Sequence, residues 1–210
     1  MSRVLKKYNV GGLPLIKKIC DRMGLSKILA QHIPAHGNDK VNIIDTLMLL
    51  IYNLTLGKNP LYELSQWVEN IDMRAIGYQL GISTLFSDDR FGRGIDRVYK
   101  ADRATLTTSI VTAFIKAFSV KFERIHNDST SVKAYGKYSN KTPTELELKN
   151  GFSKDHRPDL KQLVYCLSIS ADGAVPVHHK VYSGNRTDDT THIETCNSAH
   201  INPPTCAHIN

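Results

Sequence analysis

Cysteine is scarce in this chain of 210 residues, and long apolar runs are missing. The four cysteines (Cys20, Cys166, Cys196 and Cys206) form no CxxC pair, so no disulfide framework is expected and reduced cytoplasmic thiols are the simplest interpretation. The longest apolar patch, Thr46–Tyr52, is far shorter than the about 20 residues that span a bilayer, which argues against a membrane partner. The first residues contain no continuous apolar core, so no signal peptide is expected and the predicted location is cytoplasmic.

Negative charge is also under-represented. The chain has 27 Lys and Arg against 20 Asp and Glu, which gives a net charge of +7. The surplus is concentrated in residues 1–60 and again in residues 121–165, whereas residues 61–120 are balanced. A basic balance favours a polyanionic partner, although a solvated basic face would give the same count. The 41% hydrophobic content is that of a globular protein and excludes wholesale disorder.

Residues 1–118 have the hydrophobic period of helices, and we expect an all-α domain there. In residues 41–55, apolar side chains recur at helical spacing and predict one buried stripe (Ile44, Leu47, Met48, Ile51 and Leu54). A second long helix is expected after Asp102, a plausible N-cap. Shorter helices are predicted at Leu13–Met23, Leu25–His32, Leu61–Val68 and Asp88–Tyr99.

The period changes to that of strands after residue 118. Residues 119–127 form a β-compatible run that is expected to end at Asp128. Residues 163–170 and 175–182 alternate in hydrophobicity on either side of Asp172-Gly173, which predicts a hairpin. The polar residues 129–161 between them are expected to be loop. Residues 196–210 show no helical or strand period and have no carboxylate side chain, so this tail looks foreign to the domain before it.

Three segments together resemble DDE transposases of bacterial insertion sequences. They are residues 125–132 (IHNDSTSV), 151–162 (GFSKDHRPDLKQ) and 183–189 (SGNRTDD), and the resemblance covers residues 8–195. It implies an α+β chain with a helical N-terminal domain (1–118) for DNA binding or dimerisation. A ribonuclease-H-like core with its first three strands would follow (119–195), and then the aberrant tail (196–210).

The resemblance also implies a chemistry for Asp128, which matches the family's first catalytic aspartate. In that family two or three carboxylates hold a pair of divalent ions, usually magnesium, which activate water and then a DNA 3′-hydroxyl for attack on phosphorus. Asp128 is therefore the predicted catalytic residue and metal ligand. Taken without the resemblance, an aspartate after a strand is more often a turn or capping residue.

The basic residues of the second motif are predicted to contact DNA phosphates (Lys154, His156, Arg157 and Lys161). A solvated charged loop would explain each of them separately as well. Asp188 fits the third motif, but helix capping is the favoured interpretation of its role.

The remaining carboxylates of the family are missing from this sequence. The family carries a second Asp on a fourth strand, beside the first, and a Glu on a later helix, and no acidic residue follows Glu194. One carboxylate cannot hold two metal ions in the required geometry. The tail reads like a frameshift product or a premature end, so the sequence predicts a truncated transposase remnant that is inactive on its own.

Two other functions are compatible with the sequence. A zinc site could be drawn from irregularly spaced residues of the tail (His192, Cys196, His200, Cys206 and His208), but random composition is the favoured explanation. The N-terminal helices could instead form a DNA-binding or dimerising protein that modulates an intact transposase, as a homodimer or a heterodimer bound to element ends.

Overall fold

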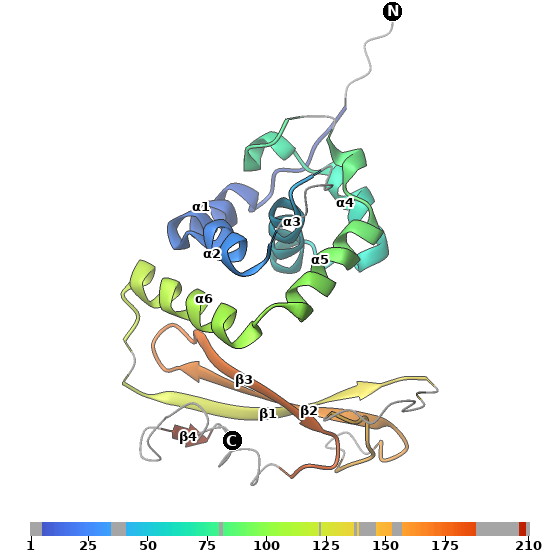
Figure 1. Cartoon of the computed structure of the whole chain (residues 1–210), viewed down its shortest axis with the longest axis vertical. Coiled ribbons are helices and arrows are strands. Elements are labelled where there is room, and N and C mark those ends of the chain that lie inside the picture. The colour runs from blue at the N-terminus through green and yellow to red at the C-terminus, as the bar shows by residue number, and fades with distance from the viewer. Residues whose placement is uncertain are drawn as a thin grey trace, which may run out of the picture. The chain divides into compact units, whose positions relative to one another are not determined.

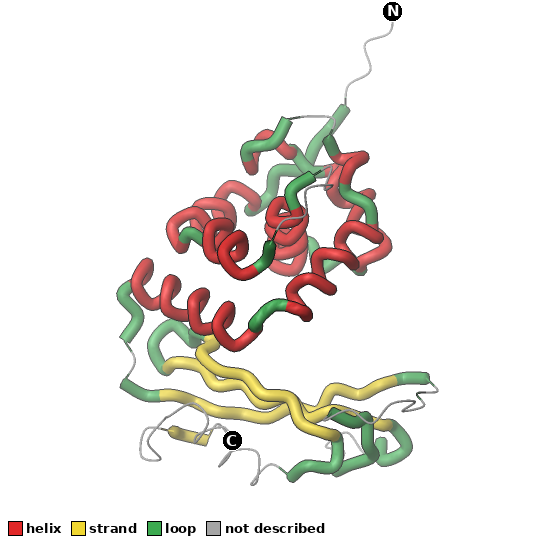
Figure 2. Tube along the Cα trace, in the orientation of Figure 1, coloured by secondary structure: helices red, strands yellow, loops and turns green. Residues whose placement is uncertain are grey.

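The computed structural model describes residues 6–34, 41–79, 82–121, 123–136, 138, 146–152 and 157–187, and the backbone of 206–208. The fold class is α+β: helices come first along the chain and strands follow (Figures 1 and 2). Internal contacts divide the chain into two compact units, Met1–Ala117 and Phe118–Asn210. In the described part of the chain, no helix has the length and apolar character needed to cross a membrane.

The described residues of the first unit form six α-helices, which confirms the predicted helical half. Short 3-10 helices η1 (Leu61–Glu63), η2 (Met73–Ile76) and η3 (Ser83–Leu85) connect them. The α-helices are α1 (Leu13–Met23), α2 (Leu25–His32), α3 (Ile43–Leu56), α4 (Leu64–Asn70), α5 (Asp88–Lys100) and α6 (Arg103–Phe118).

Local signals set several of these helix ends. Gly24 has a φ of 67° and separates α1 from α2, a conformation that glycine adopts without steric cost. The Asn42 side chain accepts a hydrogen bond from the Ile44 amide (2.9 Å) and caps α3. As predicted, Asp102 caps α6, because its carboxylate accepts hydrogen bonds from the amide and the hydroxyl of Thr105.

Helix α3 lies at the centre of the first unit and is buried on more than one face. Leu49 is fully buried, although it lies outside the predicted stripe. Leu54, which the period placed in the stripe, is 61% exposed, so that part of the prediction is wrong. The stripe fails here because α3 is buried on several faces between Ile43 and Asn53, whereas Leu54 and Leu56 at its end are exposed.

The second unit contains an antiparallel meander of three strands, as predicted. Strand β1 (Ile125–Ala134) pairs with β2 (Lys161–Ser170), which pairs with β3 (Pro176–Ser183). Strands β2 and β3 form the predicted hairpin, and Gly173 has a φ of 72° in its turn. The sheet order is β3-β2-β1-β4, where β4 is the short strand Cys206–His208 (Figure 1).

Two strand predictions are wrong. The first strand begins at Ile125 and continues to Ala134, so Asp128 lies within it and residues 129–134 are not loop. Small serines suggested a loop, but full antiparallel pairing with β2 satisfies their backbone groups. The tail was expected to contain no strand, yet β4 pairs parallel with Ile125–Asn127. A strand of three residues is too short to show a hydrophobic period, and here β1 supplies its backbone hydrogen-bond partners.

Candidate functional site

Asp128 lies in the middle of β1 on the exposed face of the sheet. Its in-register neighbour on β2 is Leu167, and Leu167 in turn pairs with His179 on β3. The Asp128 carboxylate accepts a hydrogen bond from the backbone amide of Ser129 (2.8 Å). The side chains nearest to Asp128 across the strands are therefore an aliphatic group and, one strand farther, an imidazole.

Two other described carboxylates of this unit have contacts away from Asp128. Asp172 accepts a hydrogen bond from the Lys121 amide (2.7 Å) in the hairpin turn, beyond the Ile125 end of β1. Glu147 pairs with Lys149 (2.6 Å), in the segment bridged to β2 at Gln162, next to the other end of the sheet. Among the described residues, no three His, Cys, Asp or Glu side chains are grouped as metal ligands would be. Asp188 and Asp189 lie outside the described residues.

Two of the four predicted DNA contacts can be located. Arg157 donates to both carboxylate oxygens of Asp159 (2.8 and 2.7 Å), and these bonds lower the pKa of Asp159. The Lys161 ammonium donates to the Tyr138 carbonyl (3.2 Å); Arg157 is solvent-exposed and Lys161 is half-buried. Lys154 and His156 lie outside the described residues, as do the side chains proposed for a zinc site in the tail.

The second and third motifs meet at a glycine junction, which sequence reasoning did not predict. The buried Gln162 side chain donates to the carbonyls of Phe152 (3.1 Å) and Gly184 (3.0 Å). A Cβ on Gly151 would overlap the Gly184 carbonyl oxygen, and one on Gly184 would overlap the carbonyl oxygens of Gln162 and Lys149. Close backbone packing therefore explains why positions 151 and 184 are glycine, and the two hydrogen bonds give Gln162 a structural role.

Sequence reasoning also missed three exposed aromatic side chains at this end of the sheet. Phe152 is 83% exposed, Tyr135 is 68% exposed and Tyr138 is 49% exposed. The signal that could have revealed them is their position beside glycine in a basic segment, as in Tyr135-Gly136-Lys137-Tyr138 and Gly151-Phe152.

The buried face of the sheet is unusually polar. Asn127 and Ser168 are each 1% exposed and share a hydrogen bond from the Ser168 hydroxyl to the Asn127 side-chain oxygen (3.1 Å). The next residue across the sheet is His178, whose Nδ1 is buried and has no hydrogen-bond partner among the described residues. Burial lowers the pKa of His178 from the model-compound value of 6.5.

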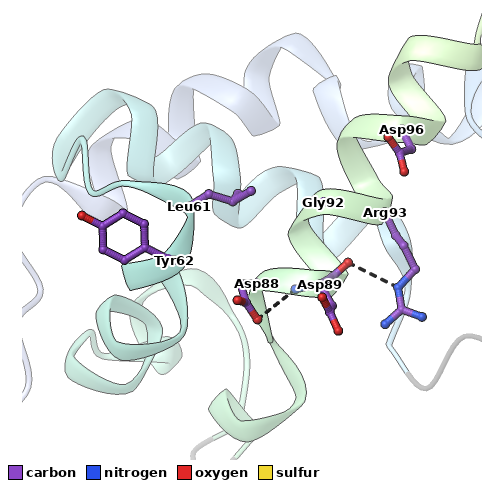
Figure 3. Close-up of a pocket in the computed structure, with 7 residues that line it drawn as sticks. All are labelled: Leu61, Tyr62, Asp88, Asp89, Gly92, Arg93 and Asp96. Atoms are coloured by element: carbon purple, nitrogen blue, oxygen red, sulfur yellow. Dashed lines mark hydrogen bonds between the residues drawn. The ribbon is translucent and has the colours of Figure 1, made fainter. Parts of the chain in front are cut away.

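The first unit contains an open acidic pocket of about 670 Å³ between η1 and the start of α5 (Figure 3). Its carboxylates come from Asp88, Asp89 and Asp96, and the Arg93 Nε donates to the Asp89 carbonyl (3.3 Å). Figure 3 shows the carboxylates spread along the helix and not pointing to a common centre. The arrangement therefore gives no basis for a cation site.

Comparison with known proteins gives one family match, to a domain of unknown function (DUF4277) over residues 5–112. The chain belongs to the DUF4277 family. The match covers about half of the chain and includes helices α1–α5 and most of α6. No curated protein and no solved structure matches the chain. The DUF4277 assignment thus identifies the helical unit and does not specify what it does.

Proposed function

We propose that this DUF4277 protein is a transposase-related DNA-binding protein whose ribonuclease-H-like sheet lacks a complete metal centre. The observation that carries the proposal is the antiparallel meander of β1, β2 and β3. The transposase resemblance implies a meander of three strands, with the first catalytic aspartate on the first strand. Asp128 occupies β1 in this way.

The residues near Asp128 do not fit a pair of magnesium ions. Each ion needs several oxygen ligands, and the two must lie about 4 Å apart. The in-register neighbours Leu167 and His179 supply no carboxylate, and β4, which lies beside β1, has the sequence Cys-Ala-His. We therefore derive no metal-dependent step for this chain.

The charge distribution supports DNA as the partner. Residues 1–60 carry nine basic and three acidic residues. On α1 and α2, the side chains of Lys18, Arg22 and Lys27 are solvent-exposed. Helix α3 is too deeply buried to enter a DNA groove, so α1 and α2 are the favoured phosphate-contacting elements. A protein that occupied DNA without cutting it could also modulate an intact transposase, as a homodimer or a heterodimer.

DNA binding is tested by fluorescence anisotropy of the full chain with a labelled duplex that carries the ends of the surrounding genetic element. We expect affinity to fall with rising salt, because phosphate contacts release counterions. The charge reversals Lys18→Glu and Lys27→Glu should weaken binding and reduce the salt slope by about 0.9 for each lost contact. Lys116→Glu on α6 is the matched control. Absence of salt-dependent binding by the parent chain would refute the proposal.

Catalysis is tested separately with the same duplex in magnesium or manganese. We expect no cleavage or strand joining above background for either the parent chain or Asp128→Ala, because one carboxylate cannot position two ions. Cleavage that disappears in Asp128→Ala would show that the metal centre is complete.

A further inference from the structure

The exposed aromatic side chains of the second unit are gathered at one end of the sheet. In the described part of this unit, the aromatic residues exposed most to solvent are Tyr135, Tyr138 and Phe152. Isolated exposed rings are ordinary, but three rings from two separate segments around one strand end need an explanation.

Contacts with the first two residues of β2 bring the backbones of the two segments together. Tyr135 directly follows Ala134, which pairs with Lys161. The Lys161 ammonium donates to the carbonyl of Tyr138. The neighbouring Gln162 donates to the carbonyl of Phe152.

The Tyr138 ring also packs close to the backbone beside Tyr135. A Cβ placed on Gly136 would lie 3.6 Å from the Tyr138 ring, so that ring lies against the glycine that follows Tyr135. Gly136 has a φ of 125°, a conformation that side-chain-bearing residues rarely adopt. The glycine therefore allows the chain to present both tyrosines at the same strand end.

The charge around these rings is positive. The described residues of the region carry four cations, Lys133, Lys149, Arg157 and Lys161, against two carboxylates, Glu147 and Asp159. Over the whole of residues 129–162 the sequence has seven basic and four acidic residues. Arg157 lies near Tyr135, and Asp159 lies near Lys133, so these charges are close to the Tyr135 end of β1.

We propose that Tyr135, Tyr138 and Phe152 form a stacking platform for the bases of unpaired DNA, with Lys133, Arg157 and Lys161 along its phosphates. This inference rests on the proposed DNA-binding function and specifies unpaired DNA as the form bound at this end of the sheet. Exposed ring faces stack on unpaired bases, whose faces are hidden inside a duplex, and the cations supply the attraction to the backbone. Stacking needs no particular base, so binding is tolerant of sequence.

The test measures the affinity of the full chain for a labelled oligothymidylate and for a duplex of the same length. Phe152→Ala and Tyr135→Ala should each weaken oligothymidylate binding by about 5- to 150-fold, the range expected for the loss of one stacked base. Duplex affinity should change little. Phe152→Trp should retain binding, because it restores a ring. Tyr62→Ala is the matched control, since Tyr62 is 74% exposed in the first unit.

The outcomes separate this inference from the proposed function. Duplex binding by the parent chain with no oligothymidylate binding, or with oligothymidylate binding that is unchanged in the alanine variants, would overturn the platform alone. Failure to bind either DNA would overturn both proposals. A parent dimer that becomes monomeric in Phe152→Ala, in sedimentation velocity without DNA, would make the rings a self-association surface and would also overturn the platform.

Discussion

At the residue scale, the glycine junction is the most demanding local feature of the second unit. Gly151 and Gly184 allow three backbone segments to approach more closely than a Cβ would permit, and Gln162 joins two of them through its amide. A buried amide that satisfies two carbonyls removes the cost of leaving them without hydrogen bonds.

We therefore predict that Gly184→Ala destabilises the second unit by at least about 2 kcal/mol, because the new methyl group overlaps backbone oxygens that cannot move aside. Gly92→Ala is the control, since a Cβ at this helical position meets nothing within 4 Å. It should stabilise the first unit by about 0.5–1 kcal/mol. Urea unfolding measured by circular dichroism gives the stability of both variants. Equal stability of the parent and Gly184→Ala would contradict the close backbone approach at Gly184.

His178 gives a pH dependence whose sign follows from its environment. Burial disfavours the imidazolium, so the folded-state pKa lies below the ordinary value of 6.5. As the pH falls through 6.5, the unfolded chain binds a proton that the folded chain does not, and the free energy of unfolding decreases.

We expect the second unit to lose stability between about pH 6.5 and the lower folded-state pKa, and His178→Gln to reduce that loss. Thermal unfolding of the parent and of His178→Gln across this pH range is the measurement. If His178→Gln leaves the pH dependence of stability unchanged, other titratable groups cause it.

At the element scale, α3 and β1 show how neighbours change what a sequence period implies. The period of α3 identified the helix and its first three buried stripe positions, Ile44, Leu47 and Met48. It could not identify Leu49 as buried or Leu54 as exposed, because burial depends on which elements cover each face. In β1, the serines after Asp128 suggested a loop, whereas pairing with β2 extends the strand to Ala134.

The contrast within α3 gives a matched pair of substitutions. Leu49→Ala should destabilise the first unit by about 2–5 kcal/mol, because it removes buried methyl groups and leaves a cavity. Leu54→Ala removes the same atoms from an exposed position and should change stability by less than about 0.5 kcal/mol. Chemical denaturation measures the free energy of unfolding of both variants. Similar losses of stability would mean that the last turn of α3 is covered in solution.

At the scale of the whole molecule, the two units differ greatly in apolar core. The first unit buries a cluster of nineteen apolar residues, which includes Leu49 and Phe91. The described part of the second unit has a cluster of three, Val164, Cys166 and Tyr182, beside the buried polar groups of the sheet. Burial of apolar surface is the dominant favourable term in folding, so the first unit should be the more stable one.

Limited proteolysis should therefore leave an N-terminal fragment that ends near residues 118–125, identified by mass spectrometry. The sheet should be digested first, because it depends on fewer buried apolar contacts. A resistant fragment that contained β2 and β3 without the helices would reverse this order of stability.

The sequence by itself determined the helical half, most helix ends and the β2–β3 hairpin. These features depend on hydrophobic period, capping residues and turn residues, which act over a few neighbouring positions. It also showed that the tail has no acidic residue, but it placed Asp128 at the end of the first strand, whereas Asp128 lies within β1. Only the tertiary structure decided where β1 ends, that β4 pairs beside it, and that Gly151, Gln162 and Gly184 meet. Those features depend on hydrogen bonds and close approaches between distant segments, which no local pattern records.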